Sequence, residues 1–206
     1  MSLKERFSQN CILFTKDQNL IENLWSEIEK NYSEKDRHYH NLEHLENMFS
    51  ELDSVKDKIS NFENISFSVF YHDVIYDATS KLNEEKSAEF AEIKLKKLNL
   101  DQDSVEKISE QIIATKAHQQ SENNDINYLL DADLSILGKD LETYLDYTRK
   151  IRKEYSIYPD LLYRPGRKKV LQHFLELENI FKTEDFREKY EDQARKNILF
   201  EIESLG

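Results

Sequence analysis

The segment from Phe67 to Asp77, FSVFYHDVIYD, is the stretch around which the rest of this chain is organised. Most of its residues are apolar or aromatic, yet its middle holds the dipeptide His72-Asp73. Such a run is suited to a protein core, where burying two charge-bearing side chains is costly unless something pairs with them. A metal cation is one such partner, so the remaining sequence can be searched for further ligands.

The composition excludes several classes of protein. The chain has 206 residues, of which 34% are charged, and its formal net charge is -12. This acidity argues against general nucleic-acid binding or an anionic membrane partner, because phosphate backbones require clustered Lys and Arg. Cys11 is the single cysteine, which excludes an internal disulfide and a thiolate-rich metal site.

Hydropathy and the start of the chain predict a location. No apolar run approaches the ~20 residues of a transmembrane helix. The first residues, MSLKERFSQNCILF, lack the long apolar segment of a signal peptide. We therefore expect a cytoplasmic protein that does not bind a membrane.

The residue types predict an all-α protein. Three Gly and two Pro are too few for a turn-rich β fold. Long stretches are instead rich in Glu, Lys, Leu, Ala and Gln, which favour helices. No internal repeat and no Pro/Gly/Ser-rich linker divides the chain, so we expect one helical domain over residues 1–206.

Apolar residues at helical spacing predict where the helices lie. The expected helices cover residues 17–31, a segment after Asn41, 61–76, 83–98, 101 or 103 to about 118, 126–137, 141–158, a segment opened by basic residues 163–169, and about 183–205. Asp17 and Asn41 are placed to cap the first two. The helix expected at 61–76 is apolar around nearly its whole circumference, which predicts a central, buried position.

Imidazole and carboxylate side chains recur on these helices. His40 and His44 are one helical turn apart and can share a face. Asp131 and Asp133 lie in the apolar segment INYLLDADLSIL, and His118 precedes it. Together with the His-Asp dipeptide they suit Mn, Fe, Zn or Mg and leave coordination positions for water. Each has an ordinary alternative, since paired surface histidines are commonly solvated and an aspartate can cap a helix or form an ion pair.

Three motifs together resemble the HD superfamily of metal-dependent phosphohydrolases. They are YHNLEH at 39–44, FYHDVIYD at 70–77 and DADLSILG at 131–138. The resemblance covers roughly residues 37–174. It is strongest to a bacterial group of predicted HD-domain phosphohydrolases of about this length, whose segments also resemble RHYHNLEH, NEEKSAE, EY and GRKKVL here. It implies an HD-type helical bundle that cleaves a phosphoester of a small phosphorylated metabolite, foremost a nucleotide.

The resemblance also implies a ligand set. His44, His72, Asp73 and Asp133 would hold a divalent metal ion, whether Mn, Mg, Fe, Co or Zn. YHNLEH and ADLS are similar to segments of the cyclic-nucleotide phosphodiesterases of the same superfamily. There the second His of the motif binds metal and the first donates a proton to the leaving group, so His40 would be the general acid. Their base-binding glutamine has no identified counterpart here, which counts against a cyclic-nucleotide substrate.

Further residues stand where some HD enzymes place additional groups. His118 would join a second metal or support the first, and Asp131 would orient a ligand or a water. Glu84 or Glu85 would activate water. The alternatives are structural: His118 closes a helix, Asp131 has a local partner, and acids in a first helical turn are favoured by the helix dipole.

Four basic residues are candidates for binding a substrate phosphate. Arg164 and Arg167 lie in the basic segment that opens a predicted helix, a natural phosphate site. Arg37 and Lys116 are further candidates. A solvated surface loop is the alternative for the basic segment.

Two other functions are compatible with the same motifs. One is a non-catalytic HD-fold module that binds metal or nucleotide for regulation. The other is a di-iron oxygenase of the HD type, which His118 and the extra carboxylates would permit. The expected partner is a small phosphorylated substrate, and a homodimer is compatible with the sequence.

Overall fold

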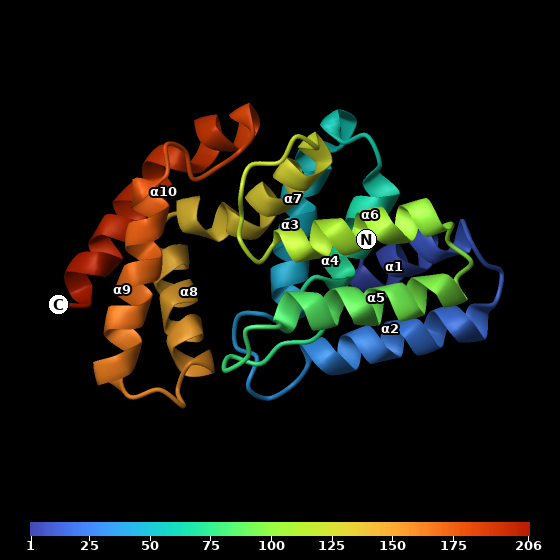
Figure 1. Cartoon of the computed structure of the whole chain (residues 1–206), viewed down its shortest axis with the longest axis horizontal. Helices are drawn as coiled ribbons and strands as arrows, with labels where there is room; N and C mark the ends of the chain where they lie inside the picture. The colour runs from blue at the N-terminus through green and yellow to red at the C-terminus, as the bar shows by residue number, and fades with distance from the viewer.

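Ten α-helices and no β-strand form the computed structural model, which describes residues 1–206 (Figure 1). This confirms the all-α prediction. The helices are α1 (Leu3–Ile12), α2 (Gln18–Tyr32), α3 (Leu42–Ser54), α4 (Phe62–Tyr71), α5 (Asn83–Lys97), α6 (Gln102–Ala114), α7 (Asn124–Leu134), α8 (Leu141–Glu154), α9 (Asp160–Glu176) and α10 (Glu184–Ser204), with short 3₁₀ helices η1 (Lys56–Lys58) and η2 (Ser135–Gly138). None of them combines the length and apolar character needed to cross a bilayer.

Side-chain caps set several helix starts. Asp17 and Asn41 each accept a hydrogen bond from a backbone N–H in the first turn of α2 and α3, so both predicted caps are confirmed. A capping box between Ser2 and Glu5 begins α1, a helix that the apolar pattern did not predict.

Helix α4 occupies the centre of the fold. It packs against α1, α3, α5, α6 and α7, and every residue from Asn64 to Tyr71 is buried. The rings of Phe7 and Phe49 lie 5.1 and 4.9 Å from the ring of Phe70. Each fully buried aromatic side chain of this kind contributes roughly 1.5–3 kcal/mol. The predicted central helix is therefore confirmed.

The end of α4 differs from the prediction. The helix stops at Tyr71, five residues early; His72 is its C-cap and Asp73 follows. The buried guanidinium of Arg37 donates hydrogen bonds to the carbonyl oxygens of Asp73 (2.6 Å) and Val74 (3.0 Å). These contacts satisfy buried carbonyls beyond the helix end. As a result, the His-Asp pair lies at the end of a buried helix rather than in its middle.

The last three helices form one end of the molecule. Figure 1 shows α8, α9 and α10 side by side near the C-terminus, with α2 and α5 at the opposite end. Helix η2 packs against both α8 and α10. A Cβ atom added at Gly138 would lie 2.5 Å from Cβ of Tyr190 and 2.8 Å from its carbonyl oxygen. A single buried apolar cluster, from Leu3 to Ile198, extends through both ends.

The basic segment does not open a helix. Helix α8 ends at Glu154 instead of 158, and α9 begins at Asp160 with Pro159 as its N-cap. Pro165 lies inside α9, although it cannot donate a backbone hydrogen bond there. The sequence pattern misplaced this start because Pro165 normally argues against a continuous helix. Arg164 and Arg167 consequently lie within α9, after its first turn.

The contact at Gly138 gives a test of the packing between η2 and α10. We expect Gly138→Ala to lower the free energy of unfolding by about 1–3 kcal/mol, because the added methyl group would overlap Tyr190, including its backbone oxygen. Urea denaturation followed by circular dichroism measures this.

Gly166→Ala is the matched control. No atom lies within 4 Å of a Cβ added at Gly166, which is inside α9. This substitution should raise the free energy of unfolding by roughly 0.5–1 kcal/mol, since alanine is the better helix residue. Equal effects at the two glycines would contradict the packing described.

Candidate metal centre

The four predicted ligands converge at the end of α4. The ligand atoms of His44, His72 and Asp133 all lie within 4.8 Å of one another. Nε2 of His44 is 3.2 Å from Nε2 of His72 and 3.2 Å from Oδ1 of Asp133. Oδ2 of Asp73 lies 3.2 Å from Nε2 of His72. Helices α3 and α7 and the end of α4 thus bring two imidazoles and two carboxylates together.

The hydrogen bonding of His72 suits a metal ligand. Its Nδ1 lies 2.9 Å from the carbonyl oxygen of Val69, which can only accept, so Nδ1 carries a proton. In the neutral ring Nε2 then presents its lone pair to His44. Two imidazole nitrogens 3.2 Å apart need a proton or a cation between them. The donor set, two imidazoles and two carboxylates, fits a divalent metal ion.

The charges of the cluster favour a cation in the same way. Burial lowers the pKa of His72, but the carboxylates of Asp73 and Asp133 outweigh it and raise this pKa to about 9. Burial raises the pKa of Asp73, yet the charge and hydrogen bond of His72 hold it below its usual range. The pKa of His44 is lowered, mainly by burial. The carboxylates of Asp73 and Asp133 are therefore stabilised by a positive charge beside them, which a divalent cation would supply.

His118 reaches the cluster through Asp133. Its Nε2 lies 2.8 Å from Oδ2 of Asp133, on the other oxygen from the one that faces His44. The backbone of His118 is left-handed, with φ of 49°, in the turn that follows α6. Its N–H donates to the carbonyl oxygen of Ala114, the last residue of α6, at 3.2 Å, so His118 closes that helix while its ring orients Asp133.

A carboxylate that the sequence did not identify holds the predicted general acid. Oε1 of Glu154 accepts hydrogen bonds from the backbone N–H groups of His38, Tyr39 and His40 at 2.7–3.0 Å. Oε2 lies 2.7 Å from Nδ1 of His40 and accepts the hydroxyl of Tyr76 at 2.9 Å. The Glu154 side chain is buried. The string EY within the family resemblance was the only signal for it.

His40 differs from its predicted placement. It precedes the N-cap of α3, so it does not share a helix face with His44. The two rings nevertheless lie 5.9 Å apart, because Glu154 bends the preceding loop toward the cluster. Burial lowers the pKa of His40, but Glu154 and Asp73 raise it above the ordinary histidine value. Burial raises the pKa of Glu154, and its hydrogen bonds with His40 and the backbone lower it to about 2.

Asp131 does not orient a metal ligand, so that prediction is wrong. Its Oδ1 accepts the N–H of Lys182 at 2.7 Å, and its Oδ2 accepts the N–H and hydroxyl of Thr183 at 2.7 Å. Residues two apart on a helix point about 200° apart, at 100° per residue. Asp133 consequently faces the cluster while Asp131 faces the start of α10. The structural alternative for Asp131, a hydrogen-bonded partner elsewhere in the chain, is therefore correct.

The predicted water-activating glutamates lie outside the pocket that His40, His118 and Asp133 line. Glu84 and Glu85 are in the first turn of α5, and neither lines that pocket. Glu85 forms an ion pair with Lys116, whose Nζ also donates to the carbonyl oxygen of Lys81 at 2.8 Å. Lys116, predicted to bind phosphate, is thereby neutralised. The sequence could not show that Glu85 and Lys116 would form an ion pair, because 31 residues separate them.

The three predicted phosphate-binding arginines are engaged elsewhere. Arg37 is buried, and its donors serve the backbone at the end of α4. Arg167 forms a two-pronged ion pair with Glu201, at 2.8 and 3.0 Å. Arg164 is half exposed and lies 3.6 Å from Asp160. The guanidinium groups of Arg37 and Arg167 are thus already used by carbonyls or a carboxylate, and Arg164, whose neighbour Asp160 is hydrogen-bonded by Arg152, does not line the pocket.

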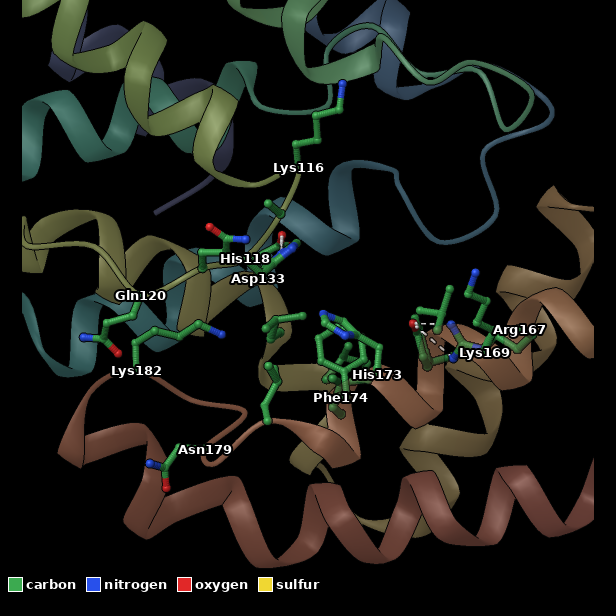
Figure 2. A pocket seen from close by; sticks show the side chains of 18 of the residues that line it. Lys116, His118, Gln120, Asp133, Arg167, Lys169, His173, Phe174, Asn179 and Lys182 are labelled. Atoms are coloured by element: carbon green, nitrogen blue, oxygen red, sulfur yellow. Dashed lines mark hydrogen bonds and ion pairs between the residues drawn. The ribbon is translucent and has the colours of Figure 1, made fainter.

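A pocket of about 960 Å³ opens beside the cluster. Figure 2 shows His118 and Asp133 on one side and His173 and Phe174 of α9 facing them. His40 lines it, together with Tyr39, Tyr147 and Tyr155. Polar residues absent from the predicted site also line it, namely Gln119, Gln120, Lys169, Asn179 and Lys182. This volume suits a small organic ligand.

Comparison of the chain with protein-family models, with curated proteins and with solved structures finds no match in any of the three. What the site can do is therefore inferred from its own residues and geometry.

The buried pair of Glu154 and His40 predicts a pH-dependent stability. The pKa of Glu154 falls from 4.5 to about 2 on folding, so its contribution is present above pH 4.5 and is lost as the pH falls toward 2. The pKa of His40 is raised from 6.5, so its contribution is present below pH 6.5 and is lost as the pH rises through the folded value. Glu154→Gln should therefore cost most between pH 4.5 and 6.5, about 3 kcal/mol.

Urea denaturation at several pH values measures this difference. Glu122→Gln, in an exposed loop position, is the control and should change the free energy of unfolding by less than about 0.5 kcal/mol at every pH. A cost of Glu154→Gln that stays constant from pH 3 to pH 9 would refute the assignment of the pair.

Proposed function

We propose that this protein is a metal-dependent phosphohydrolase that cleaves a phosphoester bond of a small phosphorylated metabolite, foremost a nucleotide. The observation that carries the proposal is the convergence of His44, His72, Asp73 and Asp133 beside the large pocket. These are the residues that the resemblance to the HD superfamily implies as ligands. They come from three separate parts of the chain, so their meeting is not a local effect of sequence.

His44, His72, Asp73 and Asp133 would hold the metal ion. A divalent cation bound there supplies a water of lowered pKa and neutralises charge on a phosphoryl group. The protein keeps the imidazole of His72 oriented through Val69 and the carboxylate of Asp133 oriented through His118.

His40 is suited to donate the proton that the leaving oxygen requires. Its Nδ1 is bound to Glu154, which leaves Nε2 as the second ring donor. Its raised pKa favours the protonated ring. The ring of Tyr76 stacks on it at 4.4 Å, which limits its rotation. His40 lines the pocket, so a leaving alkoxide there can accept its proton.

Aromatic side chains that line the pocket support an organic leaving group with a planar ring. Tyr147 and Tyr155 come from α8 and the turn after it, and His173 and Phe174 come from α9. Aromatic side chains of this kind stack on planar rings such as a nucleobase. This favours nucleotides over small sugar phosphates as substrates.

The ligand set gives the main test of the function. Protein stripped with a chelator and reloaded with Mn, Mg, Co, Fe or Zn should release phosphate from nucleotides. Asp73→Ala should lower kcat/KM at least about 100-fold, because it removes one metal ligand. The control Asp103→Ala, at an exposed position on α6, should leave kcat/KM unchanged.

Other outcomes would replace the proposal. Equal release by the wild type and Asp73→Ala would contradict metal-dependent hydrolysis at this site. Nucleotide binding without release under any metal would favour the regulatory module. Iron retained on purification together with oxygen consumption would favour the oxygenase.

The role of His40 predicts a dependence on the leaving group. His40→Ala should slow hydrolysis of an alkyl phosphate such as a nucleoside monophosphate by about 10²–10⁴. It should slow p-nitrophenyl phosphate far less, because that leaving group departs without a proton. Steady-state kinetics on both substrates measures the ratio. An equal loss on both would show that His40 does not act as the acid.

A further inference from the structure

Lys182 is a buried ammonium group that no carboxylate pairs. The residue is 7% exposed, lies just before α10 and lines the large pocket. Its Nζ donates to the carbonyl oxygen of Ile180 at 2.5 Å. The nearest carboxylates, those of Asp131, Glu191 and Asp133, act on it only through their charge at a distance.

The free donors of Lys182 face the pocket. An ammonium group has three N–H donors, and the carbonyl of Ile180 takes one of them. Figure 2 shows the side chain extending below Asp133 and His118, toward the space between them and α9. A buried ammonium without a counter-ion is unfavourable. An anion that enters the pocket beside Lys182 would remove that disadvantage.

Two carboxylates fix the backbone that carries Lys182. Asp131 is fully buried and accepts the N–H groups of Lys182 and Thr183. Glu191 accepts the N–H groups of Ile180 and Phe181 at 3.0–3.1 Å. Because Asp131 lies on α7, two residues before Asp133, it ties Lys182 to the helix that carries a proposed metal ligand.

The other basic groups of the pocket differ from Lys182. Lys116 is paired with Glu85, and Figure 2 shows it pointing away from Asp133. Arg167 is paired with Glu201, and Lys169 is exposed. Of the basic side chains that line the pocket, Lys182 alone is both buried and without a carboxylate partner.

We propose that Lys182 binds a phosphate oxygen of the ligand in this pocket, and that Asp131 is a positioning residue that holds Lys182 beside Asp133. That this phosphate belongs to a phosphoester substrate rests on the proposed function. The contact between Lys182 and an anion does not require hydrolysis, so it can be tested separately.

Isothermal titration of inorganic phosphate into the full-length, chelator-treated protein tests the anion site. Lys182→Met should weaken the dissociation constant at least about tenfold, the equivalent of 1.4 kcal/mol. Lys116→Met is the matched control, since it removes a lysine from the same pocket whose charge Glu85 already neutralises. It should change the dissociation constant less than about twofold. Lys182→Met should melt at or above the wild-type temperature, because it removes an unpaired buried charge.

A double-mutant cycle tests the positioning role of Asp131. Asp131→Asn should weaken phosphate binding in the wild-type background and have no effect on it in the Lys182→Met background. A purely structural role would weaken binding equally in both backgrounds, which would refute positioning.

Two results would overturn the anion site: no phosphate binding by the wild type, or equal binding by the wild type and Lys182→Met. If phosphate binding depends on Lys182 while no phosphoester is cleaved, the anion site stands and the hydrolase proposal fails. If phosphoesters are cleaved but phosphate binding does not depend on Lys182, the hydrolase proposal stands and the anion site fails.

Discussion

The hydrogen bonds between the Arg37 guanidinium and the carbonyls of Asp73 and Val74 support the rest of the site. They satisfy the backbone carbonyl groups just beyond the end of α4, where His72 faces His44 and Asp73. The same guanidinium lies over the rings of Tyr32 and Tyr76, so it also joins α2 to the segment that stacks on His40. Arg37, a cation predicted to bind substrate, therefore shapes the candidate metal centre instead, because it is buried and four of its donors bind Glu34 and the backbone.

Carboxylates that accept consecutive backbone N–H groups recur in this acidic chain; three are buried and that of Glu191 is partly buried. Asp125 accepts from residues 60 and 61, Asp131 from 182 and 183, Glu154 from 38 to 40, and Glu191 from 180 and 181. Each joins two segments that are distant in sequence or fixes a turn. Hydrogen bonds to the charged form offset the cost of burying it. Part of the negative charge thus serves the architecture, and it need not reflect the chemistry of a ligand.

The helices and their caps could be predicted from the sequence because they depend on local patterns. The side-chain partners that join distant segments could not. The all-round apolar character of residues 61–76 predicted the central helix, observed over Phe62–Tyr71, and the caps at Asp17 and Asn41 followed from side-chain chemistry. The convergence of His44, His72, Asp73 and Asp133 followed from motifs. Glu154 and Lys182 were missed because their partners lie 114–116 and 51 residues away, at positions that no local period connects. Arg167 and Lys116 were misjudged for the same reason, since their carboxylate partners are remote.

The loop at 38–40 has a consequence for the order of folding. Its backbone N–H groups find their acceptor on Glu154, so the loop cannot be fixed until α8 has docked. Contacts of such long sequence separation form late, because a large loop must close first. Helices α1 to α6 can collapse around α4 before the C-terminal third of the chain arrives. His40, the proposed proton donor, would then reach its place only after α8 has docked.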